Sequence, residues 1–475
     1  MDIKFGTDGW RAIIDKEFTD ENVRMVTQAT ADYVNGLKDK EELRGKELIV
    51  GYDTRKKSEV FAEDVVRVLT GNGIKVLLAD RAAPTPAISF AIKKRHLTGG
   101  VIITASHNPA NYNGFKYKAF YSGSAGSEIM DKIEANFGKN PVREISIEEA
   151  KGKGLLKTDN VIPDQLHFVE DYCDMRLLKK CGLKILVDSM HGVGGHYMQD
   201  ILSKTNCKVE TIHAERDITF GGVNPEPIEK YLGEFLECMK GKDYDIGLAT
   251  DGDVDRIGAA APGGKFLDAQ YIMALLLLHF IEDKKVTGSV VSTICGTELL
   301  RKICEKYKLK LHITPVGFKY ICDYMRAEDV LIGGEEAGGI GFKDCIPERD
   351  GILSGLLLLE MLAHRKKSIL DILKDIEEEY GSFCYLKTST EVTEDIKKKL
   401  MPSLEKNHLK EVLGKKVVNV DMLDGIKFIC EDSSWLLFRL SGTEPILRIY
   451  AEAESRERAS EILEYGKKIG TKTSG

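Results

Sequence analysis

The chain carries a short apolar run that leads into polar residues, Glu47-Leu-Ile-Val-Gly-Tyr-Asp-Thr-Arg55. A run of this length that ends in turn residues is typical of a buried strand. Helical patterns are found after Thr19 and at about residues 58–72. Further strands are expected at Lys75 to Ala79 and at Val101 to Thr104. Strands that alternate with helices predict βαβ units and a mostly parallel sheet.

This pattern occurs three times along the chain. Lys184-Ile-Leu-Val-Asp188 opens the second unit and Ser289-Val-Val-Ser-Thr293 the third, and each unit has a later strand that enters a conspicuous loop. The last hundred residues instead show short strand candidates flanked by helices at about 393–405 and 455–469, which predicts an antiparallel α+β domain. We therefore expect three similar α/β domains with mixed, largely parallel sheets and one α+β domain, with boundaries at 1–150, 151–258, 259–378 and 379–475.

Composition narrows the function classes. Hydrophobic residues make up 43% of the 475 residues and charged residues 30%, which is typical of a soluble globular protein and excludes global disorder. A net charge of −7 argues against nucleic acid as a partner. The longest apolar stretches, about 271–281 and 356–359, are too short to span a membrane and predict core helices. The ten cysteines form no C-x-x-C motif, so we expect reduced thiols and a cytoplasmic location.

The first loop with possible chemistry is Thr104-Ala-Ser-His-Asn-Pro109. Its serine, Ser106, lies just past a predicted strand, where open α/β sheets bind their ligands. His107 is its sequence neighbour and could activate it as a nucleophile. A simple polar turn closed by Asn-Pro explains the same residues about equally well. The loop lacks the G-x-S-x-G elbow that α/β-hydrolases place around their serine.

The second loop is Asp251-Gly-Asp-Val-Asp-Arg256. Three carboxylates at alternate positions would repel one another strongly without a cation, so a metal site is favoured over a solvated turn. The loop is no EF-hand, because Arg256 and Pro262 stand where that motif needs Gly and Glu. Mg²⁺ is favoured over Ca²⁺, since the protein offers few ligands and water or phosphate oxygens can supply the rest.

Two further loops carry weaker signals. Gly334-Glu-Glu-Ala-Gly-Gly339 could hold sugar hydroxyls through its carboxylates, although a plain glycine-rich turn is as good an explanation. Arg439-Leu-Ser-Gly-Thr-Glu-Pro445, with Arg448 beyond it, could form a nest for an anion. A hairpin turn with exposed arginines explains that segment equally well.

Taken together and in this order, the four loops resemble those of the α-D-phosphohexomutase family. The resemblance extends from Lys4-Phe-Gly-Thr-Asp-Gly-Trp-Arg11 to Arg439-Leu-Ser-Gly-Thr-Glu-Pro445. It implies four domains around a central cleft and an isomerase that transfers a phosphoryl group reversibly between C1 and C6 of a hexose phosphate. The transfer would proceed through a phosphoserine and a hexose 1,6-bisphosphate, with glucose phosphates favoured and mannose phosphates next.

The resemblance also implies roles for individual residues. Ser106 would carry the phosphoryl group and, with Asp251, Asp253 and Asp255, would bind one Mg²⁺. Catalysis would further involve the cations and acid/base groups Arg11, His107 and Lys116, of which His107 and Lys116 are both candidates for the general base. Substrate would contact Arg256, Lys319, Glu335, Arg439, Ser441, Gly442, Thr443 and Arg448. Glucose 1,6-bisphosphate would act as activator, and the protein would be a monomer or a homodimer.

The sugar loop departs from the family pattern at two positions. Ala337 stands where the family's Gly-Glu-x-Ser-Gly has serine, and Gly339 stands where some bifunctional members have histidine. The alternatives that stay open are a phosphoglucosamine mutase, a sugar-phosphate binding protein, and a haloacid-dehalogenase-like phosphatase that uses Asp253 and Asp255. The phosphatase fits less well, because its motif should close the first strand of its domain.

Overall fold

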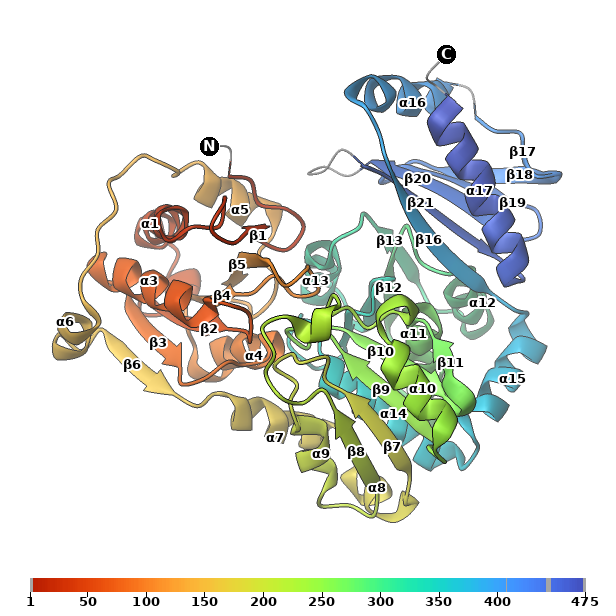
Figure 1. The fold of residues 1–475 in the computed structure, drawn as a ribbon, viewed down its shortest axis with the longest axis horizontal. Coiled ribbons are helices and arrows are strands. Elements are labelled where there is room, and N and C mark those ends of the chain that lie inside the picture. The colour runs from red at the N-terminus through yellow and green to blue at the C-terminus, as the bar shows by residue number, and fades with distance from the viewer. Residues whose placement is uncertain (1–2, 407, 441–445, 473–475) are drawn as a thin grey trace. The chain divides into compact units, whose positions relative to one another are not determined.

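The computed structural model describes residues 3–406, 408–440 and 446–472. The chain forms two compact units, which are drawn in Figure 1. One comprises Met1–Val286 and Phe318–Ile369, and the other comprises Thr287–Gly317 and Leu370–Gly475. Among the helices described, none combines the length and the apolar character that a membrane span requires.

The larger unit begins with a six-stranded mixed sheet in the order β1-β5-β4-β2-β3-β6. Strands β4, β2, β3 and the edge strand β6 are parallel, whereas β1 and β5 run antiparallel to their neighbours. This parallel centre confirms the predicted βαβ units. The strands are β1 (Trp10–Ile13), β2 (Glu47–Tyr52), β3 (Lys75–Ala79), β4 (Gly99–Ile103), β5 (Tyr112–Ala119) and β6 (Leu156–Asp159).

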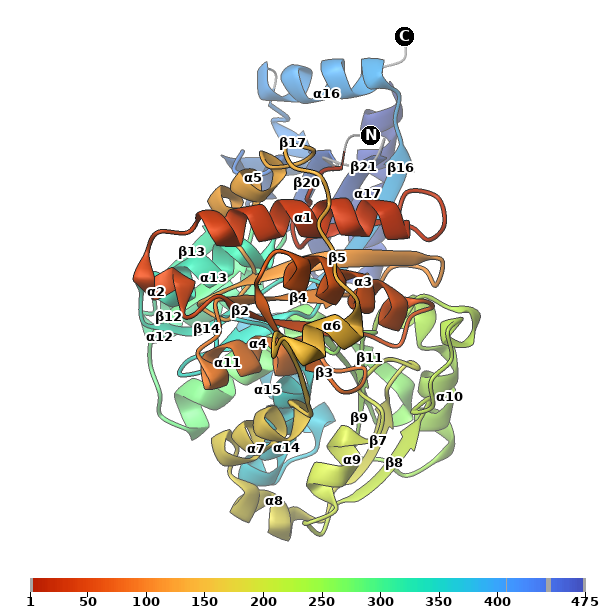
Figure 2. The ribbon, with the colours of Figure 1, turned by 90° about the vertical axis from the view of Figure 1, so that its left-hand side faces the viewer.

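Helices cover both faces of this sheet, as Figures 1 and 2 show. Leu48 and Val50 of β2 pack with α1 (Asp20–Gly36) and α3 (Ser58–Gly71), while Ile49 packs with α4 (Thr85–Arg95) on the opposite face. Successive side chains of a strand point to opposite faces, so a continuous apolar run is what a sheet buried on both faces needs. The short helices that follow are α2 (Lys40–Leu43), α5 (Ser127–Glu134), α6 (Ile147–Gly152) and α7 (Ile162–Tyr172).

A second sheet of the larger unit has the order β11-β10-β9-β7-β8. Its strands are β7 (Lys184–Asp188), β8 (Lys208–Ile212), β9 (Ile246–Thr250), β10 (Ile257–Ala261) and β11 (Lys265–Leu267). Strand β7 is parallel to β8 and β9, and β10 and β11 continue the sheet in antiparallel fashion. Helix α8 (Met175–Cys181) precedes β7, and α9 (Tyr197–Leu202) and α10 (Gly233–Gly241) lie between later strands of the sheet.

The two apolar stretches that were predicted to be core helices are buried helices. They form most of α11 (Ala269–Leu278) and the middle of α14 (Gly351–Arg365), in which Leu356 to Leu359 have no exposed surface. The same unit contains α13 (Phe318–Ala327) and the antiparallel pair β14 (Val330–Gly334) and β15 (Ile340–Phe342). Short 3-10 or π segments lie at Phe220–Gly222, Glu229–Tyr231, Pro262–Gly264 and His279–Asp283.

The smaller unit joins a parallel strand pair to the carboxyl-terminal antiparallel sheet. The pair is β12 (Ser289–Thr293) and β13 (Leu311–Thr314), connected by α12 (Glu298–Tyr307). The antiparallel sheet has the order β16-β21-β20-β19-β18-β17, and α15 (Ile369–Tyr380) leads into it. Its elements are β16 (Cys384–Glu391), α16 (Glu394–Lys406), β17 (Glu411–Val412), β18 (Lys415–Asp421), β19 (Ile426–Cys430), β20 (Trp435–Leu440), β21 (Ile446–Ala453) and α17 (Arg456–Lys472).

The two faces of strand β20 serve different cores of the smaller unit. Leu436 and Phe438 pack against α17, whereas Trp435 and Leu437 pack against Ile294. The predicted antiparallel carboxyl-terminal sheet is therefore present. The first sheet extends to Asp159 and the second to Leu267, and the boundaries at residues 150, 258 and 378 remain predictions.

A core substitution tests the first sheet's helical cover. Phe18 is fully buried, stacks on Trp10 at 4.7 Å and meets Phe61 edge-on at 4.9 Å. Phe18→Ala should destabilise the larger unit by about 3–5 kcal/mol, because it removes apolar area and leaves a cavity. Val60→Ala, at a position that is 49% exposed, should change stability by less than about 0.5 kcal/mol. Thermal melts followed by circular dichroism would compare them, and equal melting temperatures would contradict the assignment of Phe18 to the core.

Candidate active site

Two loops from different sheets meet in the larger unit. The loop at Ser106 follows β4, and the loop at residues 251–255 follows β9, so each leaves the carboxyl end of a strand. A side chain at Gly252 would lie 2.6 Å from the backbone oxygen of Ser106. Such a contact is too short for any Cβ, so glycine is what allows the two loops to approach this closely. The fold thereby brings together the two strongest sequence signals.

Ser106 lies at the junction of these loops. Its hydroxyl is buried and donates a hydrogen bond to Oδ2 of Asp251 at 2.7 Å, and Nδ1 of His107 lies 3.4 Å from it. The backbone of Ser106 has a φ of 51°, in the left-handed region that non-glycine residues rarely adopt. Strained backbone of this kind persists only where the surroundings hold it, and it is concentrated at functional sites.

The support for this strained loop comes from Arg55. Its side chain is fully buried, and its guanidinium forms an ion pair with Asp53 at 3.2 Å. Asp53 also accepts a hydrogen bond from the Thr104 hydroxyl, which in turn accepts one from the Ser106 N–H. The Arg55 guanidinium donates to four loop carbonyls, those of Ser106, Asn108, Pro109 and Tyr112. Because the guanidinium is planar and rigid, its bonds to four carbonyls fix the path of the loop.

Three buried carboxylates stand beside the serine. Asp251, Asp253 and Asp255 each offer an oxygen within 4.8 Å of the others. Burial, followed by the charges of the other two carboxylates, raises the pKa of Asp251 well above its usual value. Oδ1 of Asp253 and Oδ1 of Asp255 are buried without a hydrogen-bond partner. Buried oxygens that lack donors fit a hard cation, so this residue set matches the predicted metal site.

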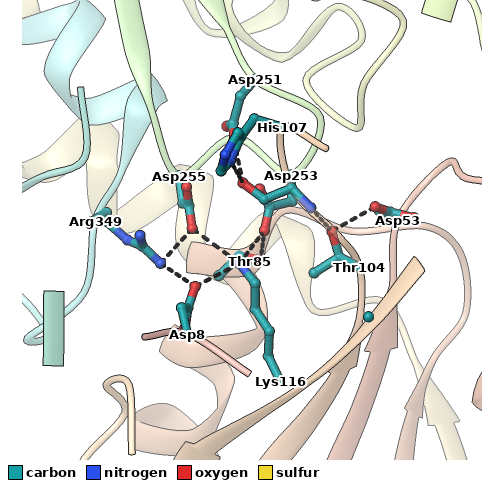
Figure 3. Close-up of polar contacts among 12 residues, drawn as sticks. Asp8, Asp53, Thr85, Thr104, His107, Lys116, Asp251, Asp253, Asp255 and Arg349 are labelled. Atoms are coloured by element: carbon teal, nitrogen blue, oxygen red, sulfur yellow. Dashed lines mark hydrogen bonds and ion pairs between the residues drawn. The ribbon is translucent and has the colours of Figure 1, made fainter. Parts of the chain in front are cut away.

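Lys116 brings a positive charge to the same carboxylates, as Figure 3 shows. It lies on β5, fully buried, with Nζ 2.8 Å from Asp253, 3.3 Å from Asp255 and 2.9 Å from Asp8. Burial lowers the pKa of Lys116, but these carboxylates raise it by more, so the pKa ends above its ordinary value. In this arrangement Lys116 is a cation.

Arg349 joins the metal loop to the predicted sugar loop. Its Nη2 lies 2.7 Å from Asp255 and 2.6 Å from Asp8, and its Nη1 lies 3.3 Å from Glu335. A side chain at Gly339 would meet Cδ of Arg349 at 2.3 Å. The guanidinium stem therefore fills the space beside the sugar loop that a larger residue at position 339 would need.

The sugar loop itself is a tight turn that is hydrogen-bonded to β10, the strand that follows the metal loop. The Glu335 N–H donates to the Gly339 carbonyl, and the Ile257 N–H donates to the Gly338 carbonyl at 3.0 Å. Gly338 has a φ of 94°, and a Cβ there would lie 2.4 Å from the Ile257 oxygen. Burial raises the pKa of Glu335 despite the nearby Arg349. Glu335 and Asp255 both form ion pairs with Arg349, which links the sugar loop to the metal loop.

Other predicted site residues lie at different distances from this centre. Arg11 donates to Oδ1 of Asn108 at 2.7 Å, which places it on the Ser106 loop. Arg256 is largely buried, with its backbone N–H on Asp251 and its guanidinium 3.7 Å from Glu226. Lys319 lies at the start of α13, half-exposed, with Nζ 5.1 Å from the Tyr320 ring centre. Lys319 takes no part in the ion pairs and hydrogen bonds described above among the Ser106 loop, the three carboxylates and Arg349.

The predicted phosphate-binding residues belong to the smaller unit. Arg439 donates from Nε to Asp424 at 2.8 Å, and Arg448 is its cross-strand partner on β21. The three remaining residues of that prediction, Ser441, Gly442 and Thr443, lie outside the described residues.

Sequence reasoning missed several residues that complete the site. Arg55 and Asp53 end the first predicted strand, so their position at the carboxyl end of β2 was an available signal. Thr85 donates from its hydroxyl to Asp253 at 2.7 Å, and Asp8 links Lys116 with Arg349. Asp8 lies within the quoted amino-terminal motif at residues 4–11 and Thr85 lies outside every quoted loop, but nothing in the sequence indicates that they contact the carboxylates or their cations.

The family is identified by comparison with known proteins. Four models of phosphoglucomutase/phosphomannomutase domains match in order: α/β/α domain I at residues 2–143, domain II at 165–264, domain III at 268–380 and the C-terminal domain at 391–465. They confirm the expected fold class of three α/β domains and a different C-terminal domain.

Individual relatives extend along the whole chain. The chain is 32% identical over 466 residues to a phosphoglucomutase/phosphomannomutase of Thermococcus kodakarensis, with 98% of both chains covered. A phosphoglucosamine/phosphogalactosamine mutase of Sulfurisphaera tokodaii is 30% identical, again with 98% of both covered. The crystal structure of a putative phosphomannomutase from Thermus thermophilus matches with a TM-score of 0.86 and 33% identity, covering 98% of each chain.

These relatives differ in the sugar that their names specify, but they share one reaction type and one fold along the same length of chain. With all four domain models matched in order, the chain belongs to the phosphoglucomutase/phosphomannomutase family and is a phosphohexomutase.

Proposed function

We propose that this phosphohexomutase moves a phosphoryl group between C1 and C6 of a hexose phosphate, with glucose phosphates favoured and mannose phosphates next. The observation that carries the proposal is the buried Ser106 hydroxyl, 2.7 Å from Asp251 in the carboxylate cluster. A hydroxyl that contacts the carboxylate cluster, with Arg11 on its loop and Lys116 on the cluster, suits phosphoryl transfer, which depends on positioning and charge stabilisation.

The reaction divides into two half-reactions at one serine. Phosphorylated Ser106 gives its phosphoryl group to the free hydroxyl of the sugar phosphate, which forms a hexose 1,6-bisphosphate. The bisphosphate reverses its orientation, and its other phosphoryl group returns to Ser106, which leaves the isomer. Glucose 1,6-bisphosphate added from outside phosphorylates Ser106 by the second half-reaction and so acts as an activator.

Asp251, Asp253 and Asp255 would hold Mg²⁺, with an oxygen of the phosphorylated Ser106 as a further ligand. The unpartnered oxygens of Asp253 and Asp255 support this assignment. Mg²⁺ prefers oxygen ligands, and when bound it would offset negative charge on the transferring phosphoryl group.

The protein's own cations have separate tasks in this proposal. Arg11, which donates to Asn108 of the Ser106 loop, and Lys116, which is held by three carboxylates, would offset the charge of the phosphoryl oxygens. His107 is the imidazole beside the Ser106 oxygen, at 3.4 Å, and we assign to it the proton exchange with the reacting hydroxyl. Between the two candidates for the base, the carboxylates around Lys116 favour His107.

Substrate recognition is assigned to both units. In the larger unit Glu335 would accept hydrogen bonds from sugar hydroxyls, and Arg256 and Lys319 would approach the substrate. In the smaller unit the substrate's non-reacting phosphate would bind Arg439, Ser441, Gly442, Thr443 and Arg448. Ala337 offers no hydroxyl to the sugar, so the choice among sugars rests on the remaining contacts. A phosphoglucosamine mutase is the alternative, and the Sulfurisphaera tokodaii relative carries that kind of name.

Phosphorus NMR of a sugar panel tests the function. Glucose, mannose, glucosamine and N-acetylglucosamine 1-phosphates would each be incubated with protein, Mg²⁺ and a trace of glucose 1,6-bisphosphate. We expect 6-phosphate signals, fastest with glucose, and a loss on the order of 10⁴-fold or more in Ser106→Ala, because no other group carries the phosphoryl.

The matched control is Ser203→Ala, at an exposed turn, which should keep the parental rate. Equal turnover by Ser106→Ala would refute the phosphoserine route. Accumulation of inorganic phosphate would instead indicate a phosphatase, and a faster amino-sugar reaction would assign the chain to the phosphoglucosamine mutases.

Metal dependence tests the carboxylate cluster. A chelator should abolish activity and added Mg²⁺ should restore it. In Asp251→Asn the Mg²⁺ concentration for half-maximal activity should rise by at least about 10–100-fold. That is the loss seen when a group that only orients a metal ligand is removed, and Asp251 would be a ligand itself. The metal-free variant should melt no lower than the parent, because one of three mutually repelling carboxylates is removed.

Asp243→Asn is the control, since the Asp243 side chain is 92% exposed and precedes β9, whereas the cluster follows that strand. Identical Mg²⁺ titrations of Asp251→Asn and the parent would contradict the assigned metal site.

Arg349 is a positioning residue in this proposal, because it acts through Asp255 and Glu335. Arg349→Lys keeps the charge but loses the planar fork that reaches both loops. We expect kcat to fall about 10–100-fold, with a rise in the Mg²⁺ requirement, as for other groups that orient metal ligands. Arg81→Lys, at a 60% exposed side chain, is the control. A variant that loses only thermal stability, with kcat and the Mg²⁺ titration unchanged, would reduce Arg349 to a structural role.

A further inference from the structure

Two of the ten cysteines meet in the second sheet region of the larger unit. Cys181 is the last residue of α8, and Cys207 immediately precedes β8. Their sulfur atoms are 3.4 Å apart, and both side chains are partly exposed. Both sulfurs also face one carbonyl oxygen, that of Leu178, at 3.3 Å and 3.7 Å. The thiols are therefore in contact with each other and reachable from solvent.

The surroundings permit a bond between these sulfurs. A disulfide bond is about 2.05 Å long, so the two atoms must approach each other by about 1.4 Å. Cys181 is followed by Gly182, which has a φ of 66° and ends the helix. Cys207 ends the turn of residues 203–207, in which Ser203, Lys204 and Asn206 are exposed. Small rotations of the two side chains at such loosely packed ends can supply this movement.

The two thiols also differ in reactivity. The hydrogen bond between them favours a thiolate within the pair, because it lowers the pKa of Cys181 and raises that of Cys207. Burial raises the pKa of Cys304 to about 12, and it also raises that of Cys322. A thiolate is the attacking form of cysteine, and a pKa near the ambient pH gives the fastest exchange. Cys181 is thus suited to attack, and Cys207 is placed to attack it in turn.

We propose that Cys181 and Cys207 form a thiol–disulfide exchange site whose co-substrate is a low-molecular-weight disulfide. The Cys181 thiol loses its proton to water, and its thiolate attacks one sulfur of the small disulfide, whose other sulfur leaves as a thiolate and takes up a proton. Cys207 then loses its proton to water and attacks the Cys181 sulfur. The second small thiol is released, and an intrachain disulfide remains. The cysteine pair loses two electrons and two protons, and the small disulfide gains both.

The site is separate from the candidate active site. Cys181 and Cys207 precede β7 and β8, which pair in parallel from Lys184 and Lys208 onward. The metal loop follows the far end of β9, which is parallel to β7. A five-residue strand spans about 16 Å, so the two sites lie at opposite ends of the parallel strands of one sheet. The proposal accordingly does not depend on the proposed function, and the mutase rate should change less than about twofold on oxidation.

Peptide mapping by mass spectrometry tests the site. The intact protein would be exposed to oxidised glutathione for graded times, its remaining thiols alkylated, and the digest examined. In the parent we expect the 181–207 disulfide to form before any other cysteine reacts. In Cys207→Ser, Cys181 should accumulate as the mixed disulfide with glutathione, because no second thiol displaces it. In Cys181→Ser the 181–207 disulfide cannot form, so any glutathione that reacts with Cys207 should stay on it as a mixed disulfide.

Cys238→Ser is the matched control, because Cys238 is partly exposed, as Cys181 and Cys207 are. This substitution should leave formation of the 181–207 disulfide unchanged. Reduction with excess reduced glutathione should restore both thiols in the parent. The proposal would be overturned if Cys238 reacted ahead of the pair, or if Cys207→Ser failed to trap glutathione on Cys181. Either result can be read independently of mutase activity, so its failure is distinguishable from a failure of the proposed function.

Discussion

The balance of charge around Asp251, Asp253 and Asp255 is the constraint on which the larger unit depends. Three buried carboxylates within 4.8 Å of one another would be unstable in a protein interior without compensation. Lys116 and Arg349 supply it from β5 and from the segment before α14, and Asp8 links these two cations. Segments more than two hundred residues apart are thereby tied to a single point. The remaining deficit, two oxygens without donors, is what a divalent cation would satisfy.

The same arrangement explains why the serine loop is strained and still well defined. Ser106 adopts a left-handed backbone, while Arg55 holds its carbonyl and that of Asn108. If Ser106 is the nucleophile, as proposed, it need not be ordered during the reaction, because folding has already met that entropic cost. Close approach at Gly252 then sets the distance between hydroxyl and carboxylates. Position and electrostatics are therefore produced by one set of contacts, and a change at any of them is felt at the serine.

Much of the fold could be read from apolar patterns. The β2 run, the helix after Thr19 and the apolar segments of α11 and α14 are where periodicity placed them. Strand β5 could not be read in this way, because it buries two lysines, Lys116 and Lys118, that look polar in the sequence. They are buried only because carboxylates from distant segments neutralise them, and local pattern carries no record of such partners.

The sequence by itself determined the fold class through the alternation of apolar strands and helices along the chain, and it determined the serine and carboxylate loops through a few consecutive residues each. Tertiary structure alone decided that Asp8, Arg55, Thr85 and Arg349 belong to the site. It also decided that Lys116 is held as a cation and that Cys181 lies against Cys207. The physical reason is common to these cases: Coulombic and hydrogen-bond energies depend on distances in space, and chain folding sets those distances between residues that no sequence motif connects.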